Sequence, residues 1–332
     1  MGDVAMTVPV IRAFLTQNPN IKITMVSRPF FKPMFAEFPN VSFLEFDEHD
    51  RHEGFLGIIK LFFDIKKQKI DAFADLHNVL RTKIVRILFS IIGKRTAVVN
   101  KGRKGKKALT RADNKIFEQQ PTMFENHKKV FEKLGFKIHI VNPKFPEKVI
   151  LDTQILKVIG TTDAVKLLGI APFAQHQAKE YPTEMMRKVV DELALNTDYK
   201  ILLFGGGNTE TVTLNSFLGK KQNVVNVAGK LPFDKELQLI SNLDLMLSMD
   251  SANAHLAAAY GVKTITLWGA THPFAGFSPF NQPIENCLVS DRNIYPKLPT
   301  SIYGNKKIAG YEEVMKTIKV EDVVNLVQNK IN

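Results

Sequence analysis

Short apolar segments alternate with amphipathic ones along the whole chain. Apolar residues recur every three to four positions, the period of a helix with one buried face, in residues 7–16, 29–38, 55–67, 83–92, 127–134, 183–196, 234–241, 254–260 and 320–330. Runs of β-branched and apolar residues predict strands at residues 21–26, 41–46, 70–76, 97–99, 137–141, 166–171, 200–204, 223–226, 245–248 and 264–268. Because strands and helices alternate, we expect an α/β fold with parallel sheets covered on both faces.

The pattern is interrupted between residues 142 and 163, where Pro143 and Pro146 indicate a linker. At roughly 150 residues per domain, a chain of 332 residues is expected to form two domains. We place them at residues 1–150 and 151–332, each built on a doubly wound, Rossmann-like parallel sheet. Ligands of such sheets bind at the carboxyl ends of the strands, and in a two-domain protein at the cleft that the domains face.

The composition excludes several classes of protein. Apolar residues make up 45% of the chain and charged residues 23%, as in soluble globular proteins. The single cysteine, Cys287, excludes an internal disulfide framework and a cysteine-based zinc site. No apolar run approaches the ~20 residues that span a bilayer, and no basic segment followed by an apolar one indicates a signal peptide.

Positive charge is concentrated in the first half of the chain. Residues 1–150 carry 27 Lys and Arg against 15 Asp and Glu, whereas residues 151–332 carry 18 of each, so the net charge of +12 lies in the first half. Its densest part, residues 94–107, favours nucleic acid, anionic lipid or a phosphorylated substrate as partner. The alternative is a solvated loop that only aids solubility. Nucleic acid is not expected, because the stretch lacks interleaved aromatic residues and no nucleic-acid-binding motif occurs.

The segment with the clearest chemistry is residues 249–261, MDSANAHLAAAYG. A predicted strand ends at an acid and a hydroxyl, and a helix of small residues then begins. The backbone N–H groups and positive dipole end of that helix suit a diphosphate, and Asp250 and His255 could orient a sugar or ribose. The alternative is that Asp250 and Ser251 only cap the helix and that His255 is a buried structural residue.

Two further strand-end loops of the second half carry polar groups. In the loop PFAQHQAKEYP, Lys179 could contact a phosphate, unless it is an ordinary surface lysine. After the next predicted strand, Gly205 and Gly206 permit close approach of a ligand to the backbone. Glu210 could accept hydrogen bonds from ribose hydroxyls or simply be solvated. These glycines match neither the Rossmann fingerprint nor a P-loop.

The first half has its own candidate residues. Asp3 precedes the first predicted helix and is either an N-cap or a base. A strand end runs into a helix at residues 75–82, DLHNVLRT. Residues 47–53, DEHDRHE, include metal-ligand types, but their spacing fits no metal motif and we interpret them as a solvated loop. The aromatic-rich residues 55–65 are expected to pack on the sheet, with contact to a membrane surface as the alternative.

Six segments, in the same order along nearly the whole chain, resemble the motifs of glycosyltransferase family 9, the lipopolysaccharide heptosyltransferases. MGDV followed by Pro9 resembles the N-terminal loop of the family, and DLHNVLRT resembles its next motif. KEYP at residues 179–182 resembles K-x-W-P, and GKL at residues 229–231 resembles the turn near the adenine. MDSANAHLAAA and then WGATHP, at residues 268–273, complete the series.

This resemblance implies the GT-B fold and a reaction. The reaction would be inverting transfer of heptose from ADP-heptose to a lipopolysaccharide core or lipid-linked acceptor. Asp3 would be the general base and Lys179 would stabilise the departing diphosphate, without a metal or a cofactor. The first domain would bind the acceptor through His77 and Arg81. The second would bind the nucleotide sugar through Gly205, Gly206, Glu210, Leu231, Asp250, Ser251, Ala252 and His255.

The resemblance also implies a location. The enzyme would be cytoplasmic and peripheral at the inner face of the cytoplasmic membrane. Its basic first domain would contact the membrane surface and the anionic acceptor.

Three departures from the family pattern bear on these expectations. Tyr181 replaces a tryptophan, and Ala252 and Asn253 replace Gly-Pro, a change that bears on the choice of sugar. The chain also begins at the loop that a first strand precedes in the family, so we expect the N-terminal domain to lack its first strand, through either a start assigned too late or a truncated protein. We expect a longer natural chain whose upstream residues raise soluble yield and activity. The alternatives are a non-catalytic nucleotide- or glycan-binding homologue and a nucleotide-sugar 2-epimerase of the same fold.

Overall fold

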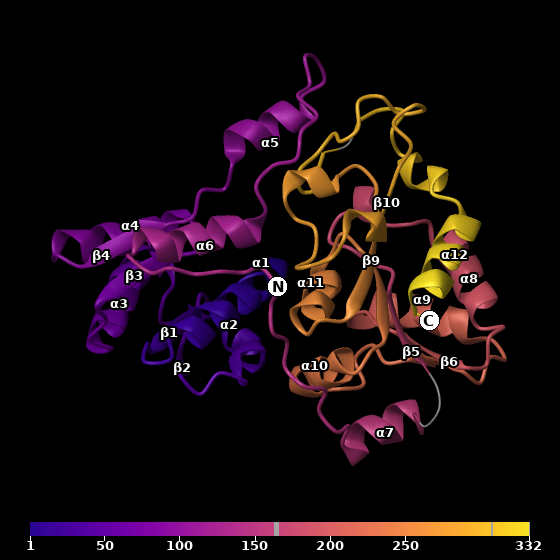
Figure 1. The fold of residues 1–332 in the computed structure, drawn as a ribbon, viewed down its shortest axis with the longest axis horizontal. Helices are drawn as coiled ribbons and strands as arrows, with labels where there is room; N and C mark the ends of the chain where they lie inside the picture. Colours follow the sequence, from indigo (N-terminus) through magenta and orange to yellow (C-terminus); the bar gives the residue numbers. More distant parts are fainter. Residues whose placement is uncertain (163–165, 307, 332) are drawn as a thin grey trace. The chain divides into compact units, whose positions relative to one another are not determined.

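The computed structural model describes residues 1–162, 166–306 and 308–331 (Figure 1). The chain forms two compact units. The first unit consists of residues 1, 3–103 and 121–144, and the second of residues 2, 104–120 and 145–332. The predicted division at residue 150 differs from these units mainly because residues 104–120 belong to the second one.

Two parallel sheets of two strands each form the first unit. In one sheet β1 (Ile23–Ser27) pairs with β2 (Val41–Glu45), and in the other β3 (Ala72–Asp75) pairs with β4 (Arg95–Val98). The predicted parallel pairing is confirmed, but no backbone ladder joins one sheet to the other within the described residues of this unit. The helices that accompany the sheets are α1 (Gly2–Ala5), α2 (Val8–Gln17), the 3₁₀ helix η1 (Pro29–Phe35), α3 (Gly54–Lys67), α4 (Leu80–Ile91) and α6 (Met123–Lys133).

Aromatic side chains hold α3 and α4 against these sheets. The ring centroid of Phe62, on α3, lies 4.9 Å from that of Phe89, on α4, and Phe89 stacks on Phe73 of β3 at 5.4 Å. Leu61 and Ile65 join the same buried cluster. The predicted packing of residues 55–65 on the sheet is therefore confirmed for one face of α3.

The second unit contains one sheet of six parallel strands. Their order is β10-β9-β8-β5-β6-β7. Counted from β5, this is the 3-2-1-4-5-6 order of the Rossmann fold, with the topological switch point between β5 and β8. The strands are β5 (Lys166–Ala171), β6 (Tyr199–Leu203), β7 (Val224–Asn226), β8 (Leu245–Met249), β9 (Lys263–Trp268) and β10 (Cys287–Val289). The helices are α5 (Arg103–Thr110), α7 (Thr153–Ile159), η2 (Gln177–Lys179), α8 (Thr183–Leu193), α9 (Gly207–Leu218), α10 (Phe233–Ser241), α11 (Ala252–Ala259), η3 (Pro273–Ala275), η4 (Ile284–Asn286), η5 (Val314–Thr317) and α12 (Val320–Ile331).

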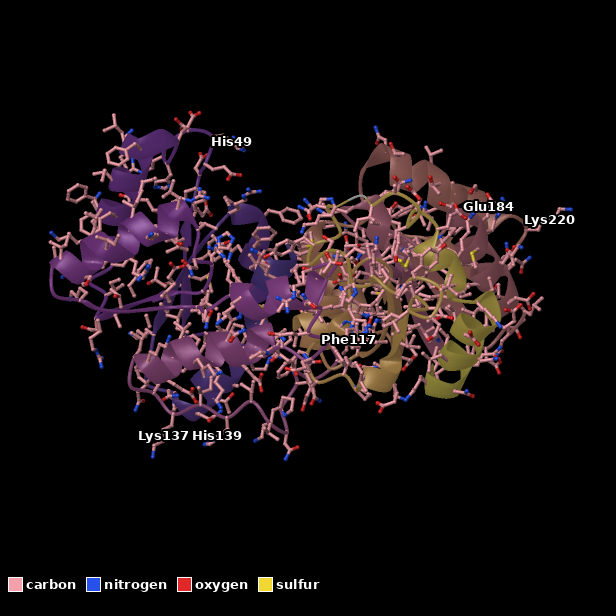
Figure 2. All side chains as sticks on the ribbon, turned by 90° about the horizontal axis from the view of Figure 1, so that it is seen from above. His49, Phe117, Lys137, His139, Glu184 and Lys220 are labelled. Carbon is pink, nitrogen blue, oxygen red and sulfur yellow. The ribbon has the colours of Figure 1, made fainter. Side chains whose placement is uncertain are left out.

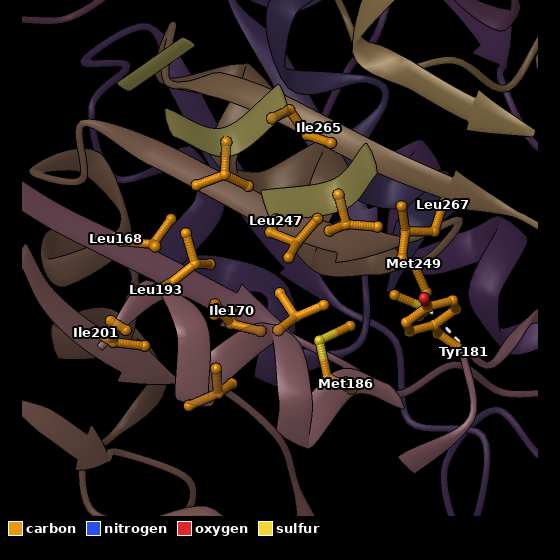
Figure 3. Packing of buried hydrophobic residues seen from close by; sticks show 14 of the residues in the cluster. Leu168, Ile170, Tyr181, Met186, Leu193, Ile201, Leu247, Met249, Ile265 and Leu267 are labelled. Atoms are coloured by element: carbon orange, nitrogen blue, oxygen red, sulfur yellow. Dashed lines mark hydrogen bonds between the residues drawn. The ribbon is translucent and has the colours of Figure 1, made fainter. Parts of the chain in front are cut away.

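A continuous apolar core lies on the side of this sheet that α8 covers (Figure 3). The central strands are buried along their length, as parallel strands covered on both faces require. Side chains of four neighbouring strands meet α8 in this core: Leu168, Ile170, Ile201, Leu247, Ile265, Met186 and Leu193. The helix α8 runs from Thr183 to Leu193 because its apolar positions recur at helical spacing and bury one face.

The predicted strand at residues 137–141 is wrong. The alternation is real, because Ile138 is buried while Lys137 and His139 are exposed and project from an irregular segment in Figure 2. The backbone of His139, however, pairs with a side chain. Its N–H donates to Gln17 Oε1 at 2.9 Å, and its carbonyl accepts from Gln17 Nε2 at 2.8 Å. One amide side chain thus occupies the groups that a neighbouring strand would otherwise bond.

Several elements were not predicted. The basic stretch expected as a loop contains α5, which buries Leu109, and the expected linker contains α7, whose N-cap Asp152 accepts a hydrogen bond from the Ile155 N–H at 3.0 Å. The helix α9 is rich in Thr and Asn, which have low helix propensity, and packing of Leu214 and Phe217 stabilises it instead. The edge strand β10 has only three residues.

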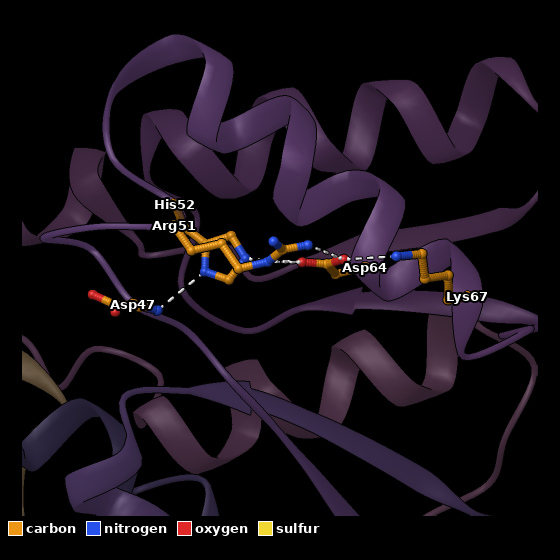
Figure 4. Close-up of polar contacts among 5 residues, drawn as sticks. All are labelled: Asp47, Arg51, His52, Asp64 and Lys67. Carbon is orange, nitrogen blue, oxygen red and sulfur yellow. Dashed lines mark hydrogen bonds and ion pairs between the residues drawn. The ribbon is translucent and has the colours of Figure 1, made fainter.

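The charged residues 47–53 form a loop, but they are not fully solvated (Figure 4). His52 is buried and stacks on the Phe46 ring, with its Nε2 3.2 Å from Asp64 Oδ2. Arg51 donates two hydrogen bonds to the same carboxylate, at 2.7 and 2.8 Å. The interpretation of residues 47–53 as a solvated run is therefore wrong for His52, which is buried, whereas the Arg51 side chain stays half exposed although it pairs with the same buried carboxylate on α3.

None of the helices in the part of the chain that the structure describes is long and apolar enough to cross a membrane.

Candidate functional site

Three strand-end loops of the second unit converge on one carboxylate. Lys179 ends the short helix η2 in the loop after β5, Asp250 follows β8 directly, and Thr271 follows β9. The strands β5 and β8 are neighbours in the sheet. Their carboxyl ends therefore border the switch-point crevice, where sheets of this order bind their ligands.

Lys179 and Asp250 form an ion pair that is largely removed from solvent. The Lys179 Nζ lies 2.8 Å from Asp250 Oδ2, and the two side chains are 14% and 7% exposed. The Thr271 hydroxyl, itself buried, donates to the same Oδ2 at 2.9 Å. Burying two charges is unfavourable unless they are paired and hydrogen-bonded, as they are here. Lys179 is therefore not the surface lysine of the alternative interpretation.

The backbone of Gly304 packs closely against the aliphatic part of the Lys179 side chain. Its φ of +77° favours glycine, and a Cβ at this position would lie 2.4 Å from Lys179 Cγ and 2.6 Å from Cδ. The buried Ser301 Oγ accepts a hydrogen bond from the Gly304 N–H at 2.9 Å. The N–H of Ser301 in turn donates to the Ala270 carbonyl, beyond β9, at 3.2 Å. The loop thus packs against the aliphatic part of Lys179, whose ammonium pairs with Asp250.

Tyr181 anchors the chain two residues beyond Lys179. It is buried, its hydroxyl donates to the Ile318 carbonyl at 2.8 Å, and its N–H contacts Met249 Sδ at 3.3 Å (Figure 3). The tryptophan expected at this position from the family pattern is thus replaced by a residue with a hydrogen-bonded hydroxyl.

The start of α11 has no side-chain cap. Ser251 occupies the N-cap position, but its side chain makes no capping hydrogen bond, and its Oγ lies 3.0 Å from Ser248 Oγ. Asp250 pairs with Lys179 instead of capping the helix. The alternative that both residues serve only as caps is therefore wrong. Ala252 begins the helix, and His255 is buried on it, as the alternative of a buried structural residue expects. The contact of His255 with the donor stays a prediction.

The glycine turn after β6 is organised by Glu210. The Gly206 N–H donates to Glu210 Oε2 at 2.7 Å, and Gly206 is the N-cap of α9. A Cβ on Gly205 would lie 3.0 Å from the same oxygen. Glu210 remains half-buried and closes the first turn of α9, so it is not simply solvated. Leu231, also half-buried, precedes α10 and stays a predicted donor contact.

The other predicted residues lie in the first unit. The Asp3 Oδ2 is 3.7 Å from His77 Nε2, and both side chains are more than half exposed. Partial desolvation lowers the pKa of His77 although half of its side chain is exposed, and Asp3 opposes that shift only in part, so the imidazole is mainly neutral at neutral pH. The Arg81 guanidinium stacks on the Phe46 ring at 3.9 Å and lies 4.0 Å from Glu48 Oε2.

Residues that the sequence analysis missed support both groups. Thr271 and Gly304 position the charged pair, and the buried His127 lies near enough to Asp3 for that charge to act on it. Burial lowers the pKa of His127 to about 4. Thr271 lies in the motif WGATHP at residues 268–273, but its contact with Asp250 could not be predicted, because it depends on which strands are neighbours in the sheet. Gly304 gives no signal in the sequence, because its role comes from one close approach.

Comparisons with known proteins agree with this arrangement. Residues 58–306 match glycosyltransferase family 9 (heptosyltransferase). The chain is 25% identical to lipooligosaccharide heptosyltransferase 2 of Campylobacter jejuni, over 98% of this chain and 94% of that protein. It is similar in fold to the ADP-heptose lipopolysaccharide heptosyltransferase II of Escherichia coli, with a TM-score of 0.71 at 18% identity over 99% of this chain and 95% of that one. The E. coli heptosyltransferase WaaC, solved with ADP, has a TM-score of 0.67 at 16% identity over 99% and 96% of the two chains.

Proposed function

The chain belongs to glycosyltransferase family 9, the heptosyltransferases, and we propose that it transfers heptose from ADP-heptose to a lipopolysaccharide core acceptor with inversion at the anomeric carbon. The fold is of the GT-B type, with parallel α/β sheets like those of the E. coli heptosyltransferase. The relatives carry heptosyltransferase names, and WaaC of the same fold was solved with ADP.

The Lys179–Asp250 pair is the observation that carries the proposal. In this pair the Lys179 ammonium is held by the Asp250 carboxylate at the switch point of the sheet, and Asp250 directly precedes Ser251, the N-cap residue of α11. A diphosphate there would interact with the ammonium, the backbone N–H groups and the positive end of the helix dipole. Within the part of the chain that the structure describes, the Lys179 and Thr271 contacts to the Asp250 carboxylate both use Oδ2, and Oδ1 would accept a hydrogen bond from a sugar hydroxyl. Glu210 would accept a hydrogen bond from the ribose through its Oε1.

The proposed reaction is a single displacement. The acceptor hydroxyl oxygen forms a bond to the anomeric carbon while the bond from that carbon to the diphosphate oxygen breaks. Asp3 accepts the hydroxyl proton as general base. Lys179 and the start of α11 stabilise the negative charge that develops on the departing ADP. The neutral His77 leaves the Asp3 carboxylate without a neighbouring imidazolium to neutralise it.

The acceptor and the location are part of the same proposal. The first unit carries 21 Lys and Arg against 12 Asp and Glu, an excess of nine positive charges. That excess suits an anionic lipopolysaccharide acceptor and the inner face of the cytoplasmic membrane. Arg81 and His77 would bind the acceptor. Metal independence stays a prediction: the described residues hold no group of three or more His, Cys, Asp or Glu side chains arranged for a metal ion.

Thermal unfolding with nucleotides tests the donor. ADP at about 100 times its dissociation constant should stabilise the protein by roughly 2.7 kcal/mol, with or without EDTA. The double variant Lys179→Gln/Asp250→Asn should lose this shift while it avoids an unpaired buried charge. A shift with UDP or GDP in place of ADP would contradict the proposed donor, and loss of the shift in EDTA would contradict metal independence.

The variant Asp3→Asn tests the base. It should abolish transfer and leave ADP binding nearly intact, because the amide keeps the shape of the carboxylate but cannot take the proton. Transfer that survives in Asp3→Asn would exclude Asp3 as the base. A wild-type protein that binds ADP-heptose and transfers nothing would favour the non-catalytic homologue, and interconversion of nucleotide sugars without an acceptor would favour the epimerase.

A further inference from the structure

The helices α3 and α4 of the first unit contact each other and leave apolar side chains in solvent. Their inner faces share the buried cluster that contains Phe62 and Phe89. Their outer faces expose Leu56, Leu80 and Ile91 at 74% each. We call the exposed residues of the two helices the α3–α4 surface: Phe55, Leu56, Lys60, Phe63, Lys66 and Lys67 on α3, with Leu80, Lys83, Ile87 and Ile91 on α4.

These residues form one stripe on each helix. On α3 the exposed positions 56, 60, 63 and 67 follow each other at spacings of three or four, and the exposed positions 80, 83, 87 and 91 on α4 do the same. Residues at such spacings lie on one side of a helix. Large apolar side chains and lysines alternate in the stripe on α3, and the stripe on α4 holds three large apolar side chains and Lys83. Single exposed apolar residues are ordinary, whereas a group of them on two helices in contact indicates an interaction surface.

The charge of the α3–α4 surface has one sign. Residues 54–69 and 80–95 together contain nine Lys and Arg and one acid, Asp64. That acid does not face solvent as a free charge, because Arg51, His52 and Lys67 bind it (Figure 4). Among the described residues, the exposed Lys60, Lys66 and Lys83 of this surface have no ion pair with an acid of either helix, and Lys67 pairs with Asp64 alone.

We infer that the α3–α4 surface docks on an anionic phospholipid bilayer. Exposed apolar side chains enter the boundary between headgroups and acyl chains, and lysines beside them pair with anionic headgroups, as in interfacial amphipathic helices. A second copy of the chain would bring two positive surfaces together, and a nucleic acid would leave the apolar side chains in water. The inference deepens the proposed membrane contact and rests on it, but it does not depend on which sugar is transferred.

Vesicle sedimentation with the full chain tests this inference. The protein should sediment with vesicles of phosphatidylcholine and phosphatidylglycerol, less at high salt, and little with phosphatidylcholine alone. The variant Leu56→Ser/Phe63→Ser/Ile91→Ser should weaken binding at least about tenfold, and Lys60→Gln/Lys67→Gln should weaken it at low salt. The matched control is Leu195→Ser/Val212→Ser, which removes side chains 77% and 69% exposed in the second unit.

Three outcomes would overturn the inference. These are equal binding to both kinds of vesicle, equal losses in the control variant, and self-association of the wild type that the surface variant abolishes without any vesicle binding. The ADP-induced thermal shift, measured on each variant, should be unchanged. Loss of that shift would reveal a folding defect, and the variants Leu56→Ser and Ile91→Ser, made singly, would then carry the vesicle test. Because sedimentation needs no turnover, a failed transfer reaction leaves this result interpretable.

Discussion

At the scale of single residues, the site depends on how Lys179 is held. Its ammonium is fixed by Asp250, and Thr271 fixes the carboxylate in turn. An exposed lysine would lose much of its side-chain freedom on binding a phosphate, whereas this one is already ordered. Gly304 adds a steric contact on the aliphatic stem. We therefore expect Gly304 to be a positioning residue for donor binding.

The variant Gly304→Ala should weaken ADP binding by about tenfold, because the new methyl group displaces Lys179 from its position. Gly310→Ala is the matched control: its φ of +78° equals that of Gly304 within a degree, and a Cβ there meets nothing within 4 Å. Both variants should lose about 1 kcal/mol of stability from the left-handed backbone. Titration calorimetry with ADP separates them. Equal affinities in the two variants would show that Gly304 has no role in positioning Lys179.

The sequence predicted these residues unevenly. Lys179, Asp250 and Ser251 could be singled out, because they stand at strand ends in an α/β pattern and in motifs that resemble a known family. Their pairing could not be predicted, since it depends on β5 and β8 being neighbours although 73 residues lie between the end of β5 and the start of β8. Gly304 and His127 could not be predicted at all, because their roles come from contacts between residues far apart in the chain.

At the scale of elements, local patterns predicted the strongly periodic segments and failed where tertiary contacts decide. The strand β5 and the helix α12 begin where apolar periodicity begins. Residues 137–141 alternate like a strand, but the amide of Gln17 takes their bonds. The helix α9 has weak helix formers and gains its stability from the buried Leu214 and Phe217. In each failure a hydrogen bond or a packing contact outside the local pattern decides the structure.

The variant Tyr181→Phe should lower stability by about 1 kcal/mol, because it leaves the buried Ile318 carbonyl without its hydroxyl donor. This bond ties the start of α8 to the turn before α12, so the loss should appear as a lower midpoint of chemical unfolding with an unchanged slope. Tyr295→Phe is the control, since the hydroxyl of Tyr295 has no hydrogen-bond partner among the residues described. Equal losses in the two variants would contradict a structural role for the Tyr181 hydroxyl.

At the scale of the whole molecule, charge is distributed by unit rather than by halves of the sequence. Residues 104–120 carry five Lys and Arg and two acids, and they belong to the second unit. Lys115 donates to the Pro299 carbonyl at 2.8 Å, and the Arg292 guanidinium lies 3.5 Å from the centre of the Phe117 ring. The first unit has an excess of nine positive charges, whereas residues 1–150 have an excess of twelve. The unit that is expected to bind the anionic acceptor and the membrane is therefore basic, but less so than the division at residue 150 implied.

Stability should fall as the pH decreases below about 6.5. Burial lowers the pKa of His127 and of His272 to about 4, whereas histidines of the unfolded chain titrate near 6.5. Between these values unfolding takes up protons, which favours the unfolded state as the pH falls. Burial raises the pKa of Glu236 to about 7, and this group acts in the opposite direction. The loss of stability from the two histidines together is expected to exceed the gain from Glu236.

The variant His127→Gln isolates one of these groups, because Glu236 and His272 contribute equally to variant and wild type. Between pH 6 and pH 4.5 the free energy of unfolding of the variant should fall less steeply than that of the wild type, by roughly 1 kcal/mol per pH unit. Urea unfolding at several pH values measures the difference. Parallel pH profiles would show that His127 titrates alike in the folded and unfolded states.

The central claim is that the chain moves a heptose from ADP-heptose to an anionic core acceptor. The most direct measurement incubates the protein with ADP-heptose and lipopolysaccharide from a heptose-deficient strain, and follows the acceptor mass together with the anomeric configuration of the product. We predict a mass increase of one heptose, inverted configuration, and no product with Asp3→Asn. ADP binding without any change in acceptor mass, or a product of retained configuration, would contradict the account.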